Sequence, residues 1–240
     1  GLSKNKMNIN RNKRIYAYDK FIWDESLESK VSDSRFANKF KPGDNYKNTF
    51  EENLEPFLNY IEVRGDVFDF GWHKQNIEFL FIDAMKNPWV TDYILKYFYP
   101  YLVPGLSTIV YQDFDHYLTP WVHILIYRYR KYFRVLHDIP GSGGFVLHSK
   151  KKIPISQLRF SLDEINDKET DKAFSYCLSV ADKPKCNNIA AAHIKYYMLT
   201  SRLEKALLLI DKYSNKYKFE GSELDDVQVE LNKFLCPNIQ

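Results

Sequence analysis

Polar side chains that could do chemistry follow two short apolar runs in the middle of the chain. The runs are residues 77–82 and 106–111, and a helix-like segment with a Pro-Gly turn separates them. The polar side chains are Asp83 after the first run, and Gln112, Asp113 and His116 after the second. Apolar strands joined by a crossover helix are typical of a βαβ unit in a parallel sheet. Ligands bind beyond the carboxyl ends of such strands, so we expect these side chains to share one rim.

His116 is the residue of this rim that could act as a general base. An imidazole titrates near neutral pH and can take a proton from a substrate hydroxyl. The alternative is a loop histidine that bonds a neighbouring backbone group, because the sequence gives His116 no visible partner. Asp83 and Asp113 could bind a ligand, but acids at these positions also cap the helices that follow them. Position alone leaves both interpretations open.

Two further strands are predicted in the first third of the chain, and each is followed by an acid. Residues 14–19 are β-forming and stop at Asp19, and residues 60–64 are closed by Gly65 and Asp66. An acid at the tip of an early strand is where doubly wound folds bind a pair of ribose hydroxyls. Between these strands the pattern predicts a turn at residues 41–44 and a short helix over residues 49–59.

The segments after the rim predict a helix, a hairpin and then a helical region. Thr119 suits the cap and Pro120 the first turn of a helix that runs to residue 132. Residues 132–137 and 144–148 alternate as two edge strands around a Gly-rich turn. Helical periodicity then covers residues 163–180, 190–199, 203–213 and 223–235. We therefore predict an α/β fold, with a Rossmann-like, mostly parallel sheet in residues 1–155 and a helical extension in residues 156–240.

Several residues near the rim have both a functional and a structural interpretation. Trp89, Tyr117 and Trp121 could wall a sugar or aromatic acceptor, although aromatic residues in such helices more often pack in the core. His123 lies within the predicted helix, which favours a structural role. The glycines of residues 140–144 resemble a phosphate-binding loop in composition only, because the lysine and helix that such a loop needs do not follow. A turn is favoured there.

The composition limits the class of protein. The 240 residues are 45% hydrophobic and carry a net charge of +3, which predicts a globular chain without a nucleic-acid partner. Cys177, Cys186 and Cys236 have no metal-binding spacing and predict free thiols. No apolar run suits a membrane span or a signal peptide, so we expect a cytoplasmic protein with no membrane partner. Two lysine-rich segments, residues 150–152 and 212–218, are interpreted as solvated faces.

Taken together, the strand-tip motifs resemble class I S-adenosylmethionine-dependent methyltransferases, nearest the branch that contains macrocin O-methyltransferase. The resemblance covers roughly residues 10–150 and depends on the order and spacing of four motifs. These are Tyr16-Ala-Tyr-Asp19, Gly65-Asp66, Phe79-Leu-Phe-Ile-Asp83, and Val103-Pro-Gly105 followed by Gln112-Asp113. The resemblance implies methyl transfer to an oxygen of a sugar-containing or other small acceptor.

The resemblance also implies roles for the strand-tip residues. Asp19 would bind the ribose hydroxyls of S-adenosylmethionine, and Gly65-Asp66 would lie near its adenine. Asp83 would lie beside the methionine end of the cofactor or bind a divalent metal such as Mg²⁺. Gln112 stands where the metal-dependent branch has an acid, so the set Asp83, Gln112 and Asp113 would make a weakened metal site. That branch also has a basic carboxylate two residues after Asp83, where this chain has Met85.

One expected part of the family is missing from this sequence. The family's first strand and its Gly-rich cofactor loop should precede Asp19 by about one helix, but residues 1–13 contain no glycine cluster and look like the end of a helix or a loop. We expect the chain to be part of a longer polypeptide with further domains. Two other functions stay open: a non-catalytic, methyltransferase-like interaction module, and a nucleotide-sugar-binding protein of another class.

Overall fold

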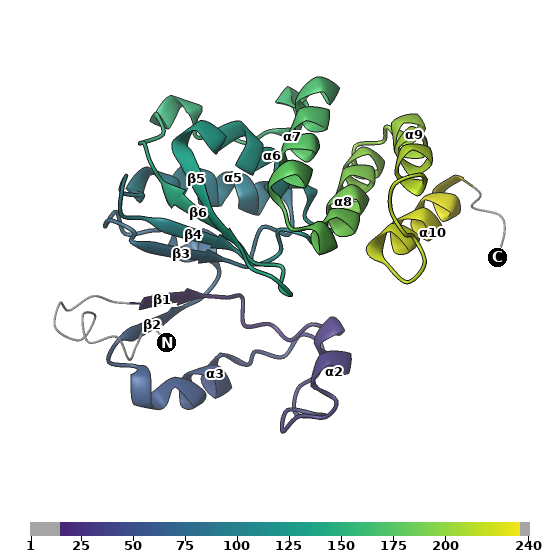
Figure 1. Ribbon diagram of the computed structural model, residues 1–240. Coiled ribbons are helices and arrows are strands. Elements are labelled where there is room, and N and C mark those ends of the chain that lie inside the picture. Colours follow the sequence, from purple (N-terminus) through teal and green to yellow (C-terminus); the bar gives the residue numbers. More distant parts are fainter. Residues whose placement is uncertain (1–14, 236–240) are drawn as a thin grey trace. The chain divides into compact units, whose positions relative to one another are not determined.

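A computed structural model gives the chain an α/β architecture with C-terminal helices and describes residues 15–235 (Figure 1). The chain divides into two compact units, residues 1–73 and 74–240, and each has a sheet of its own. The expectations for residues 1–13 and Cys236 lie outside the described residues. Cys177 and Cys186 are free thiols, as predicted. The boundary expected between residues 155 and 156 remains a prediction.

The first unit is built on two parallel strands, β1 (Ile15–Tyr18) and β2 (Ile61–Arg64), where β-forming residues predicted them. The helical segments of this unit are α2 (Ser26–Val31), α3 (Lys47–Leu54), the 3-10 turn η2 (Glu55–Phe57) and α4 (Val67–Phe70). The predicted turn at residues 41–44 is present. The Asp44 N–H donates to the Lys41 carbonyl at 2.9 Å, and Gly43 supplies the positive φ of 93° that the turn requires.

The second unit contains a four-stranded sheet in the order β3-β4-β6-β5. Its strands are β3 (Phe79–Ile82), β4 (Thr108–Tyr111), β5 (Phe133–Asp138) and β6 (Phe145–Ser149). β3 and β4 are parallel, as the βαβ pattern predicted, and β6 is antiparallel to both β4 and β5. The sheet is therefore mixed. The interior position of β6 corrects the prediction of two edge strands, because the hairpin places its second strand beside β4.

Helices connect and extend this sheet (Figure 1). The segments that follow β3 and β4 are α5 (Pro88–Tyr97) with the 3-10 turn η3 (Tyr99–Tyr101), and α6 (Pro120–Tyr129) with η4 (Arg130–Tyr132). The short 3-10 turns η5 (Ile155–Gln157) and η6 (Leu162–Glu164) lead to the C-terminal helices. These are α7 (Asp167–Val180), η7 (Lys183–Lys185), α8 (Cys186–Leu199), α9 (Leu203–Ser214) and α10 (Glu223–Leu235). Among the described residues, none of the helices is long and apolar enough to cross a membrane.

Burial differs between the two faces of the second sheet. Alternate strand residues point into a core that includes Ile82, Ile109, Tyr111, Phe145 and Leu147. On β3 the residues between them, Phe79 and Phe81, are 44% and 53% exposed. The outer edge of β3 has no strand neighbour among the described residues. Natural proteins rarely leave an edge strand unpaired when it carries exposed phenylalanines, so the open edge of β3 is unusual.

Candidate functional site

The ends of β3 and β4 bring the predicted rim residues together. The Gln112 N–H donates to the Ile82 carbonyl at 2.9 Å, so the residues that follow the two strands are neighbours. Lys86 then bridges the two carboxylates: its Nζ lies 3.0 Å from Asp83 Oδ1 and also binds Asp113 Oδ2. Neither carboxylate caps a helix, because Asn87 caps α5 and no side chain caps α6. The capping interpretation of Asp83 and Asp113 is therefore wrong.

The charged side chains of this cluster shift the pKa values of one another. Burial raises the pKa of the Asp83 carboxyl and the nearby Asp113 adds to this, while the Lys86 ammonium opposes it. Partial burial lowers the pKa of Lys86, but its hydrogen bonds to Asp113 and Asp83 outweigh that effect and raise it above its usual value. Lys86 therefore stays charged over the physiological pH range and faces two acids at once.

A divalent metal does not fit this arrangement. The Lys86 ammonium binds the same carboxylate oxygens of Asp83 and Asp113 that a cation would need. Within the described part of the chain, no three His, Cys, Asp or Glu side chains are grouped so that they could hold a metal ion. A hard cation needs several oxygen ligands, and the neutral amide of Gln112 is a weak replacement for a third charge. Met85, where a base is expected by resemblance, is buried and only 3% exposed.

His116 has a partner that its sequence context does not reveal. Its Nδ1 lies 3.3 Å from Oε1 of Glu223, the first residue of α10. The other carboxylate oxygen of Glu223 accepts the backbone N–H of Tyr117 at 3.0 Å, which fixes the carboxylate beside the ring. The interaction with Glu223 raises the pKa of His116 against the opposing effect of burial. Nδ1 faces the carboxylate without hydrogen-bond geometry, so the contact is an ion pair when the imidazole is charged, and the other ring nitrogen can exchange protons.

The loop that carries Asp113 and His116 is fixed from several sides. Thr119 stands at the N-cap position of α6, as predicted, but its hydroxyl makes no capping bond and donates instead to the Asp113 carbonyl at 2.8 Å. The Phe114 N–H donates to the Gly143 carbonyl at 3.0 Å, in the Gly-rich turn of the hairpin. A Cβ on Gly143 would lie 2.3 Å from the Gln112 carbonyl oxygen, so only glycine permits this approach. The turn at residues 140–144 thus supports the rim and, as predicted, is a turn.

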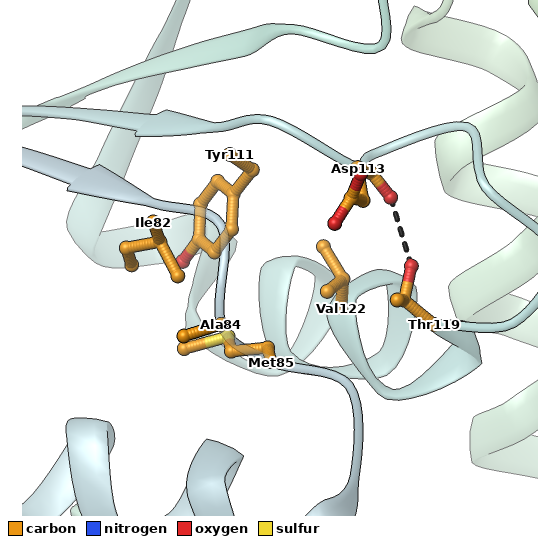
Figure 2. A pocket seen from close by; sticks show the side chains of 7 residues that line it. All are labelled: Ile82, Ala84, Met85, Tyr111, Asp113, Thr119 and Val122. Atoms are coloured by element: carbon orange, nitrogen blue, oxygen red, sulfur yellow. Dashed lines mark hydrogen bonds between the residues drawn. The ribbon is translucent and has the colours of Figure 1, made fainter. Parts of the chain in front are cut away.

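A small hollow lies beside Asp113 at this rim (Figure 2). It has a volume of about 10 Å³ and is lined by Ile82, Ala84, Met85, Tyr111, Asp113, Thr119 and Val122. A space of this size holds at most about one water molecule. The hollow is too small for an organic ligand, whereas the side chains of Lys86 and His116 are 51% and 39% exposed. Trp89 lies three residues after Lys86, at the start of α5, and its aromatic side chain is 79% exposed.

The first unit has its own pair of strand-tip acids. Asp19 directly follows β1, and its Oδ1 accepts the Phe21 N–H at 2.6 Å and the Tyr46 hydroxyl at 2.9 Å. These bonds hold the chain in an unusual turn. In this turn the buried Phe21 has a positive φ of 55°. Burial, together with the Asp19 carboxylate, raises the pKa of Tyr46 to about 12. Asp19 Oδ2 has no hydrogen bond to another residue of the described range, so it can accept one from a ligand.

Gly65 and Asp66 follow β2 at the same rim of the first unit. The Asp66 carboxylate accepts the Phe68 N–H at 3.0 Å and caps α4, and it lies 3.7 Å from Lys20 Nζ. Gly65 lies against the Phe70 ring, which would be 2.8 Å from an added Cβ and would have to shift to make room for one. Asp66 is thus the one rim acid whose capping role is observed. Its contact with Lys20 shows that the ends of the two parallel strands are neighbours.

Sequence reasoning missed Lys86 and Glu223, which complete the rim of the second unit. Lys86 could have been found, since it lies three residues after Asp83 and a helix was expected there. Glu223 had no sequence signal, because 106 residues separate it from Tyr117. Of the other candidates, Trp121 and His123 are buried in the core, as their structural interpretation required. Tyr117 is partly buried, with Lys195 Nζ 5.9 Å from its ring centre.

No protein-family model, curated protein or solved structure matches the chain. The assignment of a function therefore depends on the geometry of these two rims.

Proposed function

We propose that the chain is part of an S-adenosylmethionine-dependent methyltransferase that acts on a hydroxyl of a sugar-containing or other small acceptor. The observation that carries this proposal is the His116–Glu223 pair beside the ends of β3 and β4, where open α/β sheets bind their ligands. The proposed sheet is Rossmann-like, with one more parallel strand on the free edge of β3. The edge of β3, which pairs with no other strand of the described residues, supports such a neighbour.

The residues of the chain have distinct parts in the proposed reaction. S-adenosylmethionine supplies, when bound, a methyl group that is already activated on a sulfonium. Asp19 and Asp66 of the first unit would hold the ribose and the adenine of the cofactor, as the resemblance implies. His116 takes the proton of the acceptor hydroxyl at Nε2 as the oxygen gains the methyl group, and Glu223 stabilises the imidazolium that forms. The Asp113 carboxylate, which Lys86 binds, can accept a hydrogen bond from a second acceptor hydroxyl.

Calorimetry with S-adenosylhomocysteine on the full-length protein tests the cofactor part of this proposal. We expect binding, and we expect Asp19→Asn to weaken it by at least about tenfold, because a lost hydrogen bond to a charged group costs about 1.5–3 kcal/mol. Asp33→Asn, an exposed substitution in the same unit with the same charge change, should leave the affinity unchanged. No heat at millimolar ligand, or an equal loss in both variants, contradicts the assignment.

The pH dependence of methyl transfer tests the role of His116. A general base must be neutral, so the rate should rise as the pH increases through the raised pKa of His116. Glu223→Gln removes the carboxylate that raises this pKa, and the rising limb should therefore move to lower pH. Asp226→Asn, on the same helix, is the matched control and should not move it. His116→Ala should slow transfer by about 10²–10⁴-fold.

A non-catalytic interaction module is the second candidate function. The observation that favours it is the Lys86 ammonium, which already neutralises Asp83 and Asp113, above a hollow of only about 10 Å³. In such a module the rim would be a structural ion-pair cluster. The calorimetric experiment separates the two candidates, because a module binds no S-adenosylhomocysteine.

A further inference from the structure

Basic side chains from two distant segments meet around Tyr132 in the second unit. Arg130 and Lys131 belong to η4 together with Tyr132. The backbone N–H groups of Lys150 and Lys151 donate to the Tyr132 carbonyl at 2.8 and 3.2 Å, just after β6 ends. We call the five exposed side chains of this region the basic surface: Arg130, Lys131, Lys150, Lys151 and Lys152.

The charges of the basic surface are not neutralised by acids. None of its five side chains forms an ion pair with another residue of the range 15–235. Arg130 instead donates to the Tyr127 carbonyl at 2.6 Å, and Lys131 Nζ lies 4.9 Å from the centre of the Tyr132 ring. By contrast, Arg128 and Arg159 nearby are paired with glutamates. A cluster of five uncompensated cations attracts a surface of opposite charge.

A groove beside the basic surface could receive an anionic headgroup. Its volume is about 350 Å³, and it is lined by Arg128, Tyr129, Lys131, Ser156, Gln157, Arg159 and Glu164. Lys131 belongs to both features, and the Tyr132 hydroxyl donates to Gln157 Oε1 at 2.6 Å. The groove and the basic surface are therefore one continuous region, in which cations outnumber acids.

Two exposed aliphatic side chains lie on the segments that border these cations. Ile155, at the start of η5, is 73% exposed and precedes the groove residue Ser156. Leu106 is 50% exposed, and the turn before it is bonded to the end of β6 by the Gly105 N–H and the Ser149 carbonyl at 2.8 Å. Exposed aliphatic groups beside lysines and arginines are typical of surfaces that enter the headgroup layer of a bilayer.

This combination favours a membrane over a nucleic acid. Proteins that bind single-stranded nucleic acids offer exposed aromatic rings on which bases stack. Here Tyr129 and Tyr132 are buried, and the exposed apolar groups are aliphatic. Clusters of four to eight Lys and Arg residues bind anionic phospholipids, with about 1 kcal/mol from each cation near the surface.

We propose that the basic surface docks this unit on a bilayer rich in anionic phospholipid, with Ile155 and Leu106 in the headgroup layer. The basic surface lies at the end of the sheet where β4 begins, whereas Asp113 follows the other end of β4. A docked unit thus presents its rim away from the bilayer surface. The proposal replaces the expectation that residues 150–152 are a solvated face without a membrane partner. It is independent of methyl transfer.

Co-sedimentation of the full-length protein with vesicles tests this docking. The vesicles contain phosphatidylcholine alone or with about 30% phosphatidylserine, at low salt where the electrostatic attraction is long-ranged. We expect binding to the anionic vesicles only. Replacing Lys150, Lys151 and Lys152 together by glutamine should weaken it on the order of 100-fold, since each cation is worth about fivefold.

Matched variants separate the basic surface from net charge. Replacing Lys212, Lys216 and Lys218 by glutamine removes the same charge from an exposed helix end and should change binding less than about twofold. Ile155→Ser should weaken binding severalfold, whereas Leu208→Ser, at a site 70% exposed, should not. Circular dichroism checks that each variant is folded. No binding to anionic vesicles, equal losses in the two lysine variants, or tighter binding to a single-stranded RNA than to vesicles overturns the proposal.

Discussion

Two histidines near the rim show how their surroundings decide what a side chain can do. His116 is partly exposed beside Glu223, which raises its pKa and leaves it able to exchange a proton. His123 is fully buried, with ring centres of Phe114 and Phe174 at 5.3 and 4.9 Å. Burial lowers the pKa of His123 to about 3. Only His116 can therefore serve as a base near neutral pH.

We predict that His123 weakens the fold in acid and that His123→Phe removes this effect. Below about pH 6.5 the unfolded chain binds a proton at His123 but the folded chain does not, so the free energy of unfolding falls by about 1.4 kcal/mol per pH unit. The loss continues down to the lowered pKa of about 3. Phenylalanine fills a similar volume among rings and has no proton to gain.

Urea denaturation of both proteins at several pH values between neutral and acid measures this difference. As the pH falls, the free energy of unfolding should decrease less for the variant than for the original protein. The other histidines contribute equally to both proteins and cancel in the comparison. A difference that does not change with pH would show that His123 has the same pKa in the folded and the unfolded chain.

The sequence predicted which residues end the strands but not what those residues bind. Asp83 and Asp113 were found because each directly follows a β-forming, apolar run, and a strand's end is a local feature. Their shared partner Lys86 lies 27 residues from Asp113, and Glu223 reaches His116 from the last helix. Such pairs form through tertiary packing. The local periodicity of hydrophobic residues in the sequence does not predict them. The structural role of His123 was expected from its place in a helix, whereas the partner of His116 was not, because Glu223 is distant in sequence.

At the scale of elements, the β5–β6 hairpin supports the loop after β4. The buried Lys185 binds Asp138 at the end of β5 and donates to the Gly144 carbonyl at 3.1 Å, which fixes the base of the hairpin turn. Within this turn, the Gly143 carbonyl accepts the Phe114 N–H. The rim thus depends on a hairpin that contributes no rim side chain itself.

We predict that Gly143→Ala displaces the loop that carries Asp113 and His116. The new Cβ would lie 2.3 Å from the Gln112 carbonyl oxygen and 2.8 Å from Asp115 Oδ1, so the two segments must separate. Overpacking of this kind costs about 1–3 kcal/mol of stability. The displacement should also lower the raised pKa of His116 toward its ordinary value, because the distance to Glu223 increases. Thermal denaturation and an NMR titration of the imidazole measure the two effects.

Gly141→Ala is the control for this prediction. Gly141 has a positive φ of 69° with open space around it, so alanine there strains the backbone by about 1–2 kcal/mol without touching the rim. Its His116 titration should be unchanged. If both variants leave the titration of His116 as it was, the hairpin does not position the rim.

The elements were predicted more fully than their arrangement. Strands at residues 14–19 and 60–64 and helices at 203–213 and 223–235 were found because alternation and helical periodicity are local. The hairpin was also found, from its glycines. The order of the strands was not, because the insertion of β6 between β4 and β5 is a choice among pairings that hairpin chemistry leaves open. That choice turns the expected mostly parallel sheet into a mixed one.

At the scale of the whole chain, the two units differ in how much apolar surface they bury. In the first unit the buried apolar side chains of the described residues are Phe21 and Trp23. The second unit has a continuous core from its sheet through α6, α7 and α8. Hydrophobic burial is the main source of folding free energy, so a unit with so few buried side chains has little to offset its chain entropy. Asp19 and Asp66 lie in this weaker unit.

We therefore predict that residues 74–235 fold when produced alone and that residues 15–73 do not. The longer fragment should unfold in urea as one cooperative transition, with dispersed amide signals in NMR spectra, because its core is complete within it. The shorter fragment should give no cooperative transition. Since β3 keeps an open edge with Phe79 and Phe81 about half exposed, the longer fragment should also associate as its concentration rises, and Phe81→Lys should reduce that association. A cooperative transition in the fragment of residues 15–73 would contradict the prediction, because it would show that Phe21 and Trp23 suffice as a core.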